Sequence, residues 1–158
     1  PGTVLFEGTS VSEGRGTTRP FELVGAPGIV AERFAEKMNR LRLPGVHFRP
    51  AVFEPTFHKH ARQTCGGCQI HILDRAAFEP VLVGAALVAL FRSEDPAGFR
   101  WREPPYEYEH DKTPIDILAG SNVLRREIEA ETPLEALVAS WRADEKEFER
   151  LRRPYLLY

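Results

Sequence analysis

The run PVLVGAALVALF, from Pro80 to Phe91, contains the longest apolar stretch of the sequence, and we expect the fold to form around it. Its length favours a helix over a strand. Pro80 suits the first turn, because the N–H that proline lacks has no intrahelical partner there. The run is shorter than the roughly 20 residues that a membrane span requires. It therefore predicts a buried helix in a globular domain.

Two extended segments precede this helix. The stretch CQIHILD, residues 68–74, alternates apolar and polar residues and places Ile70, Ile72 and Cys68 on one side, which is typical of a strand. Residues 46–57 alternate in the same way but contain two prolines, which cannot donate to a strand ladder. We expect the second segment to lie at a sheet edge. The residues between the two strands, including Gly66 and Gly67, predict a loop with a tight turn.

The N-terminal part predicts a strand, a long loop and a helix. Thr3–Phe6 is rich in β-branched and aromatic residues and reads as a short strand. Gly8–Pro20 is a loop of glycines and hydroxyl side chains, and Gly25–Gly28 a turn. A helix then follows and ends at the stretch LPG, residues 43–45. Its predicted apolar face comprises Val30, Phe34, Met38 and Leu41.

The C-terminal third predicts three further helices. Residues 93–113 read as a proline-rich connection. The stretches PIDILAG and SNVLRREIE follow as two short helices, the second capped by Ser121.

The last helix has the clearest predicted boundaries. Thr132 suits its N-cap, Pro133 its first position and Glu135 a capping box, while Pro154 ends it. Glu149 and Arg153 form a favourable i,i+4 pair. The predicted apolar stripe comprises Leu134, Leu137, Val138, Trp141 and Phe148.

Composition places these elements in one ordinary globular domain, residues 1–158. The net charge of −2 argues against a nucleic-acid partner. Helices and strands without strict alternation favour an α+β fold, with a small mixed or antiparallel sheet packed against helices and a long C-terminal helix. Met38 is the only methionine, so we expect Pro1 to be a processed or excised end with something upstream removed.

The stretch FEGTSVSEGRGTTRPFE, residues 6–22, is too polar for a core and is punctuated by three glycines. It is not a dinucleotide-binding loop, because the third glycine of that pattern is absent and Pro20 stands where a helix should begin. One interpretation is a surface loop whose hydroxyls bond to its own backbone. The other is recognition of a polar ligand. In that case the fork of Arg15 would suit a carboxylate, and Glu7 and Glu22 would accept from sugar hydroxyls.

Two cysteines form the stretch CGGC, residues 65–68, with three histidines nearby. Zinc or redox chemistry would use such residues. However, one CxxC is half of a usual zinc site, and the odd spacing places Cys68 and His71 on opposite faces of a strand. The simpler interpretation has Cys68 packing as a small hydrophobe. His58, Lys59 and His60 then line a surface loop, for which the edge of a cleft is one interpretation.

No serine nucleophile motif G-x-S-x-G is present. The 23 carboxylates are too many for sequence to show which two would flank a scissile bond. The aromatic stretch FRWREPPYEYEH, residues 99–110, suits either sugar stacking or a connection whose aromatics pack on the core.

Five blocks carry a resemblance to a known family. LFEGTSVSEGRGTTRPFELVGAP, LPGVHFRP, FEPTFHKH, CGGCQIHILD and RRPYLLY together resemble the C-terminal domain of the NamZ-type exo-β-N-acetylmuramidases, over nearly the whole chain. The resemblance implies a bacterial two-domain enzyme that releases N-acetylmuramic acid from non-reducing ends of cell-wall fragments. It implies a Rossmann-like N-terminal domain that carries the catalytic glutamates, with this domain packed against it and the cleft between them.

The resemblance therefore implies no catalytic residue, metal or cofactor in this chain. Expected partners are a muramic-acid-containing sugar or peptidoglycan fragment and the N-terminal domain, with no nucleic acid and no membrane span. A periplasmic or secreted location is implied. The lactyl carboxylate of muramic acid would give Arg15 a task. The expected substrate-binding residues are Glu7, Thr9, Ser12, Arg15, Thr17, Glu22, His58 and Lys59.

Two other hypotheses remain open at this point. The chain could be a freestanding carbohydrate-binding or protein-interaction module without catalytic activity, or a zinc-stabilised domain.

Overall fold

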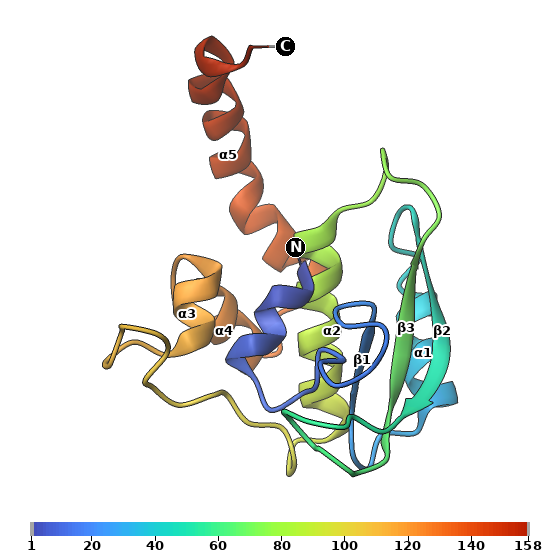
Figure 1. Cartoon of the computed structure of the whole chain (residues 1–158). Helices are drawn as coiled ribbons and strands as arrows, with labels where there is room; N and C mark the ends of the chain where they lie inside the picture. The colour runs from blue at the N-terminus through green and yellow to red at the C-terminus, as the bar shows by residue number, and fades with distance from the viewer. Residues whose placement is uncertain (1, 158) are drawn as a thin grey trace.

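A small antiparallel sheet and one buried helix organise the protein. The computed structural model describes residues 2–157 and has the predicted α+β architecture (Figure 1). In chain order its elements are the 3-10 helix η1 (Gly2–Gly8), β1 (Leu23–Ala26), α1 (Ala31–Arg40), β2 (Val46–Phe53), β3 (Cys65–Ile72), α2 (Pro80–Glu94), α3 (Pro114–Ala119), α4 (Val123–Glu129), α5 (Leu134–Arg152) and the 3-10 helix η2 (Arg153–Tyr155).

The strands are ordered β1-β3-β2, and both neighbouring pairs are antiparallel. β3 is the central strand and places Cys68 opposite Val24 of β1 and Pro50 of β2. β2 lies at the edge, which confirms the position that its prolines predicted.

Gly66 and Gly67 lie inside β3, so the tight turn predicted for them is wrong. A Cβ on Gly66 would lie 1.9 Å from the carbonyl oxygen of Ile29, and one on Gly67 would lie 2.0 Å from that of Val24. Neither distance leaves room for a side chain. The two glycines therefore let the neighbouring backbone approach the central strand closely.

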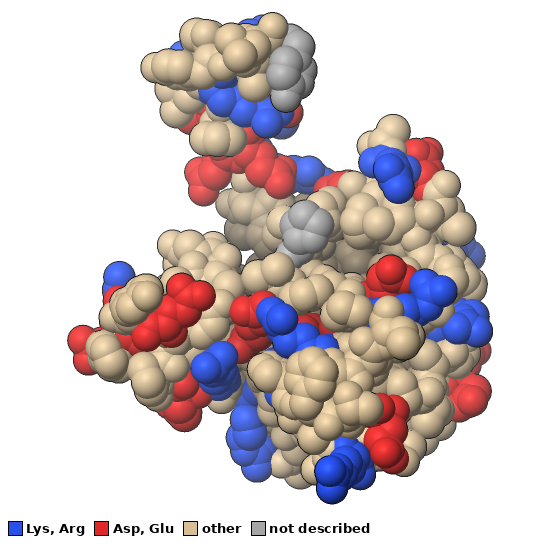
Figure 2. Space-filling view, in the orientation of Figure 1, with Lys and Arg blue, Asp and Glu red and all other residues tan. Residues whose placement is uncertain are grey.

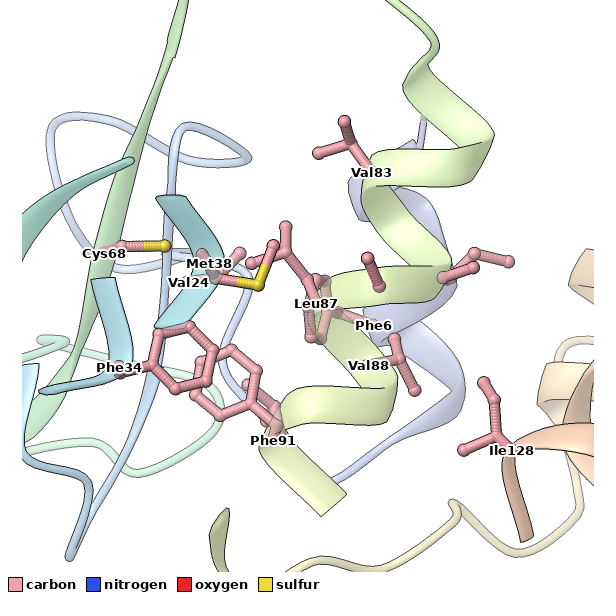
Figure 3. Packing of buried hydrophobic residues seen from close by; sticks show 14 of the residues in the cluster. Phe6, Val24, Phe34, Met38, Cys68, Val83, Leu87, Val88, Phe91 and Ile128 are labelled. Atoms are coloured by element: carbon pink, nitrogen blue, oxygen red, sulfur yellow. The ribbon is translucent and has the colours of Figure 1, made fainter. Parts of the chain in front are cut away.

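Helix α2 forms the centre of the core, as its sequence predicted. Its side chains are buried on nearly all sides, which is what a helix without a polar face requires. Phe91 of α2 lies between Phe34 of α1, at 4.1 Å between ring centroids, and Phe6 of η1, at 5.8 Å (Figure 3). Cys68 contributes to the same cluster from the sheet.

The first segment is a 3-10 helix, and the strand predicted for Thr3–Phe6 is wrong. Close packing explains the difference. A Cβ on Gly2 would lie 1.7 Å from the carbonyl oxygen of Pro80, and one on Gly8 would lie 2.7 Å from the backbone of Ile115. Contacts with α2 and α3 thus override the local preference of β-branched residues for a strand.

Several predicted helix details also need correction. In α1, Phe34 and Met38 are buried as expected, but Val30 and Leu41 are exposed because the helix occupies only Ala31–Arg40. The short helices α3 and α4 form where predicted. Asn122, and not Ser121, occupies the N-cap position of α4, although the Ser121 hydroxyl accepts a bond from the Val123 N–H at 3.3 Å.

Helix α5 begins at Leu134, and its predicted capping box is wrong. Pro133 occupies the N-cap position, while the Thr132 hydroxyl donates to Glu127 at 2.6 Å. Glu149 lies 3.9 Å from Arg152, so this ion pair replaces the one predicted with Arg153. Of the predicted stripe, only Leu137 is fully buried. The reason is that α5 projects from the body of the protein, as Figure 1 shows.

Candidate functional site

The polar stretch after η1 is held by its own hydrogen bonds. The Thr9 hydroxyl donates to the carbonyl of Phe6 at 3.0 Å and accepts from the N–H of Val11 at 3.1 Å. The Ser12 hydroxyl accepts from the N–H of Gly14 at 3.1 Å. Both side chains are 1% exposed. Thr9 and Ser12, two of the expected substrate-binding residues, therefore serve the backbone of their own segment.

Glu13 is the centre of a polar cluster beside this segment. Its carboxylate is fully buried and accepts bonds from Lys59 at 2.8 Å and from Arg15 Nε at 3.1 Å. His58 Nδ1 lies 3.5 Å from the same carboxylate. A buried carboxylate needs such partners, because its desolvation is otherwise uncompensated.

Lys59 ties two distant segments together. Besides Glu13, its ammonium donates to the carbonyl oxygens of Phe6 at 2.6 Å and Val11 at 3.1 Å, so all three N–H donors are used. Burial lowers the pKa of Lys59, although the charge of Glu13 acts in the opposite direction. The structure thus gives Lys59 an internal role.

Arg15 connects Glu13 to a second carboxylate. Its Nη2 donates to Glu7 at 2.7 Å, and the Tyr106 hydroxyl donates to the other oxygen of Glu7 at 2.8 Å. The guanidinium also lies over the Phe21 ring, 4.8 Å from its centroid. Two nitrogens of the guanidinium therefore already bond within the chain, and the part of Arg15 in substrate binding stays a prediction. The third nitrogen, Nη1, makes no hydrogen bond within residues 2–157.

These contacts shift the protonation of the groups involved. Burial opposes the charge of Glu7, but the bonds from Tyr106 and Arg15 outweigh it, and the pKa of Glu7 lies below its ordinary value. The bond to Glu7 raises the pKa of Arg15. Burial, together with the bond to Glu7, raises the pKa of Tyr106 to about 12. Glu7 is therefore ionised at neutral pH, with both oxygens engaged.

Left-handed backbone conformations gather around this cluster. His58, His60 and Arg62 have φ values of 72°, 55° and 61°, and Phe21 and Glu107 have 65° and 52°. The two other non-glycine residues with positive φ follow α1 and α4 closely, where such a conformation commonly ends a helix. Strain of this kind persists where the surrounding structure fixes it, and it concentrates at binding and catalytic sites.

Two further expected site residues, like Thr9 and Ser12, lie outside the cluster. The Thr17 hydroxyl donates to the carbonyl of Gly14 at 2.6 Å and accepts from the N–H of Arg19. Glu22 is exposed and pairs with Arg19 at 2.9 Å. The structure thus brings four expected residues together, which are Glu7, Arg15, His58 and Lys59.

Sequence reasoning missed two members of the cluster. Glu13 lies within the polar stretch of residues 6–22, but nothing in its local pattern predicts that it is buried. Tyr106 lies 99 residues from Glu7, and only its place in an aromatic, proline-rich connection suggested a role. The complete polar cluster consists of Glu7, Glu13, Arg15, His58, Lys59 and Tyr106.

The polar cluster is nearly balanced in charge, with two carboxylates against the cations of Arg15 and Lys59. Arg15 and His58 remain 40% and 44% exposed, so they form its outer surface. Acidic and basic side chains also alternate over the face in Figure 2. A ligand would therefore be selected here by directed hydrogen bonds more than by net charge.

The two cysteines are arranged for packing. Cys65 and Cys68 are both buried in β3, and their odd separation points them to opposite faces, as it does Cys68 and His71. Three residues of extended strand span about 10 Å, which exceeds the reach of a disulfide. Burial raises the pKa of Cys65 to about 11 and that of Cys68 further. Among residues 2–157, no three metal-binding side chains converge.

None of the helices within residues 2–157 is long and apolar enough to cross a membrane.

The chain is similar to several known proteins. All of it, residues 1–158, matches the family described as exo-beta-N-acetylmuramidase NamZ, C-terminal. It is 40% identical to the peptidoglycan beta-N-acetylmuramidase NamZ of Bacillus subtilis (strain 168), covering 100% of this chain and 36% of that protein. The chain thus spans little more than a third of that relative.

Two solved structures share the fold. A crystal structure of a DUF1343 family protein from Bacteroides fragilis NCTC 9343 matches with a TM-score of 0.83 at 26% identity, over 99% of this chain and 40% of that one. A second DUF1343 crystal structure from the same bacterium has a TM-score of 0.60 at 22% identity, over 99% and 38% of the two chains.

Proposed function

Because the chain belongs to the family of NamZ-type exo-β-N-acetylmuramidase C-terminal domains, as its sequence blocks indicated, we propose that it forms the C-terminal part of a peptidoglycan glycoside hydrolase. In this proposal it is a single domain that completes a substrate cleft in a longer parent chain. The parent would release N-acetylmuramic acid from non-reducing ends of cell-wall fragments.

The polar cluster carries the proposal for this chain. It joins two carboxylates, a guanidinium and an imidazole on loops with left-handed backbone, and its outer surface consists of groups that can bond sugar hydroxyls. The Nη1 of Arg15 and the His58 ring would donate to the sugar. The lactyl carboxylate of muramic acid would meet Arg15 at its unengaged edge.

The carboxylates of the cluster suit binding better than proton transfer. A general acid of a glycosidase needs a raised pKa, whereas the pKa of Glu7 is lowered. Glu13 is fully buried and bonded to two cations. We therefore propose that the acid and base come from the N-terminal part of the parent chain.

Hydrolysis of a chromogenic muramide tests the proposal. The parent chain is expected to release the chromophore, and the 158-residue chain alone is expected to release none. Nuclear magnetic resonance titration of the 158-residue chain should show weak binding of N-acetylmuramic acid, with the largest shifts at Arg15 and His58. Turnover by the 158-residue chain alone would contradict the proposal that the catalytic acid and base come from the N-terminal part of the parent chain. Binding without any turnover by the parent would favour a freestanding carbohydrate-binding module.

A further inference from the structure

A groove of about 520 Å³ separates the projecting helix α5 from the beginning of α2. Its rim is charged, and Arg142 of α5 bridges it to Glu79 at 2.6 Å. Figure 2 shows α5 standing clear of the body beside this hollow. The apolar side chains of the groove are Phe78, Pro80, Val81, Leu82, Trp141 and Phe148.

The apolar stripe of α5 continues past the part that the body covers. Its first half packs on the core through Leu134, Leu137 and Trp141. Phe148 and Leu151 continue the stripe at spacings of seven and three residues, but they are 62% and 52% exposed. An isolated helix of this length is marginal in water, so its outer half needs a partner to stay ordered.

The beginning of the described chain lies against the first turns of α2, next to this groove. Gly2 packs against the backbone of Pro80 and Gly84, in the first turns of α2. In Figure 1, η1 runs alongside α2 from this end. In a longer member of the family, the preceding polypeptide would therefore enter next to the groove. A tethered partner at this position has a high effective concentration.

We propose that the groove between α2 and α5, with the outer half of α5, is the docking surface for the N-terminal part of the parent chain. The family match is to a C-terminal domain, and the chain covers 36% of its Bacillus subtilis relative, so a large N-terminal part is the expected neighbour. The inference rests on the proposed function only in requiring that parent chain. The proposed contact lies on the outer half of α5 and in the groove between α2 and α5, next to Gly2.

Hydrogen–deuterium exchange of the 158-residue chain and the parent chain tests the surface directly. Amides of residues 143–157 are expected to exchange at least tenfold more slowly in the parent, since the partner covers them there. Equal exchange in the two proteins would overturn the proposal. Slow exchange in the 158-residue chain that depends on concentration, with a dimer in sedimentation, would also overturn it and identify a second copy as the occupant.

Two matched variants of α5 add a second readout. Phe148→Gln replaces a groove side chain, whereas Ala143→Gln places the same residue at an exposed position outside the groove. In the parent chain, F148Q is expected to lower the thermal midpoint by several degrees and A143Q to leave it unchanged. In the 158-residue chain, both midpoints should match the unmodified protein. Equal effects of the two variants in the parent would contradict the proposal.

Activity separates this inference from the proposed function. A parent chain that hydrolyses the muramide while residues 143–157 exchange freely would contradict only the docking surface. An inactive parent with protected residues 143–157 would contradict only the proposed function.

Discussion

The hydroxyl of Tyr106 donates to Glu7 at 2.8 Å and so joins the proline-rich connection to the end of η1. The bond occupies the oxygen of Glu7 that Arg15 leaves free. The position of Glu7 in the polar cluster thus depends on a residue far away in the sequence.

Replacement of Tyr106 by phenylalanine removes this bond and leaves Glu7 with Arg15 alone. The free energy of unfolding is expected to fall by about 1.5–3 kcal/mol, as for a hydrogen bond to a charged group. Urea denaturation measures the loss. Tyr108→Phe is the matched control, because Tyr108 is almost fully exposed and its replacement should have no effect. Equal losses in the two variants would contradict the role of the bond.

Acid should weaken the protein partly through Glu7. Its pKa is lower in the folded chain than its ordinary value of 4.5, so the unfolded chain binds more protons in this range. The stabilisation from Glu7 is therefore present above about pH 4.5 and is lost as the pH falls through the folded pKa. Between the folded pKa of Glu7 and its ordinary value, the free energy of unfolding of Glu7→Gln should fall less steeply with decreasing pH than that of the unmodified chain. Urea denaturation at several pH values measures both slopes.

In Glu7→Gln, the dependence of the free energy of unfolding on pH should be reduced but still present. Glu94, whose pKa is lowered mainly by its bond from Lys37, contributes in the same direction and is unchanged. Identical slopes in the two proteins would show that Glu7 does not titrate as described.

Loss of the Lys59 ammonium should be severe. Lys59→Met leaves Glu13 buried without one of its two cations and removes an N–H donor from the carbonyl oxygens of Phe6 and Val11. A loss of about 3–5 kcal/mol is expected in urea denaturation. The double variant with Glu13→Leu should lose less than the single one, because the uncompensated carboxylate is gone. Lys112→Met, at an exposed lysine, serves as the control.

Both thiols should be unreactive in the folded chain. Cys65 and Cys68 are buried, and burial raises their pKa, so little thiolate is available for reaction. Titration with a thiol-specific disulfide reagent is expected to label neither cysteine in buffer and both in denaturant. Rapid labelling of the folded protein would argue against the packed arrangement of β3.

Arg15→Lys tests the cluster as a substrate surface. Lysine keeps the charge but replaces the rigid planar fork with one compact ammonium, which does not reproduce the geometry in which the guanidinium bonds Glu7 and Glu13 and presents Nη1. In the parent chain, kcat/KM on the muramide is expected to fall about tenfold or more, which is about 1.4 kcal/mol. Arg19→Lys changes an exposed arginine outside the cluster and should leave kcat/KM unchanged. Equal values for both variants would place the sugar elsewhere.

The sequence predicted the elements whose signals are local. Helix α2 was evident from its apolar run, and the edge position of β2 from its prolines. The segment at Thr3–Phe6 was mistaken for a strand, because its conformation depends on glycine contacts with α2 and α3. The burial of Glu13 likewise depends on Lys59, which is 46 residues away. Interactions of this range leave no periodic signal in a single sequence.

Interactions between distant residues also explain why only some residues of the candidate site could be predicted. Glycines and hydroxyls correctly marked residues 6–22 as unusual. Their composition did not distinguish Thr9 and Ser12, which bond to their own backbone, from Arg15, which connects two carboxylates.

Arg62 is a position at which the stability of the protein could be raised by substitution. Its backbone is left-handed, and its exposed side chain forms no ion pair within residues 2–157. Glycine adopts that geometry without a steric penalty of about 1 kcal/mol, although it also makes the unfolded chain more flexible. A rise in the free energy of unfolding of Arg62→Gly, together with unchanged sugar binding, would show that the left-handed backbone at this position is not needed for the site. A loss of sugar binding would instead show that the left-handed backbone of Arg62 serves the site.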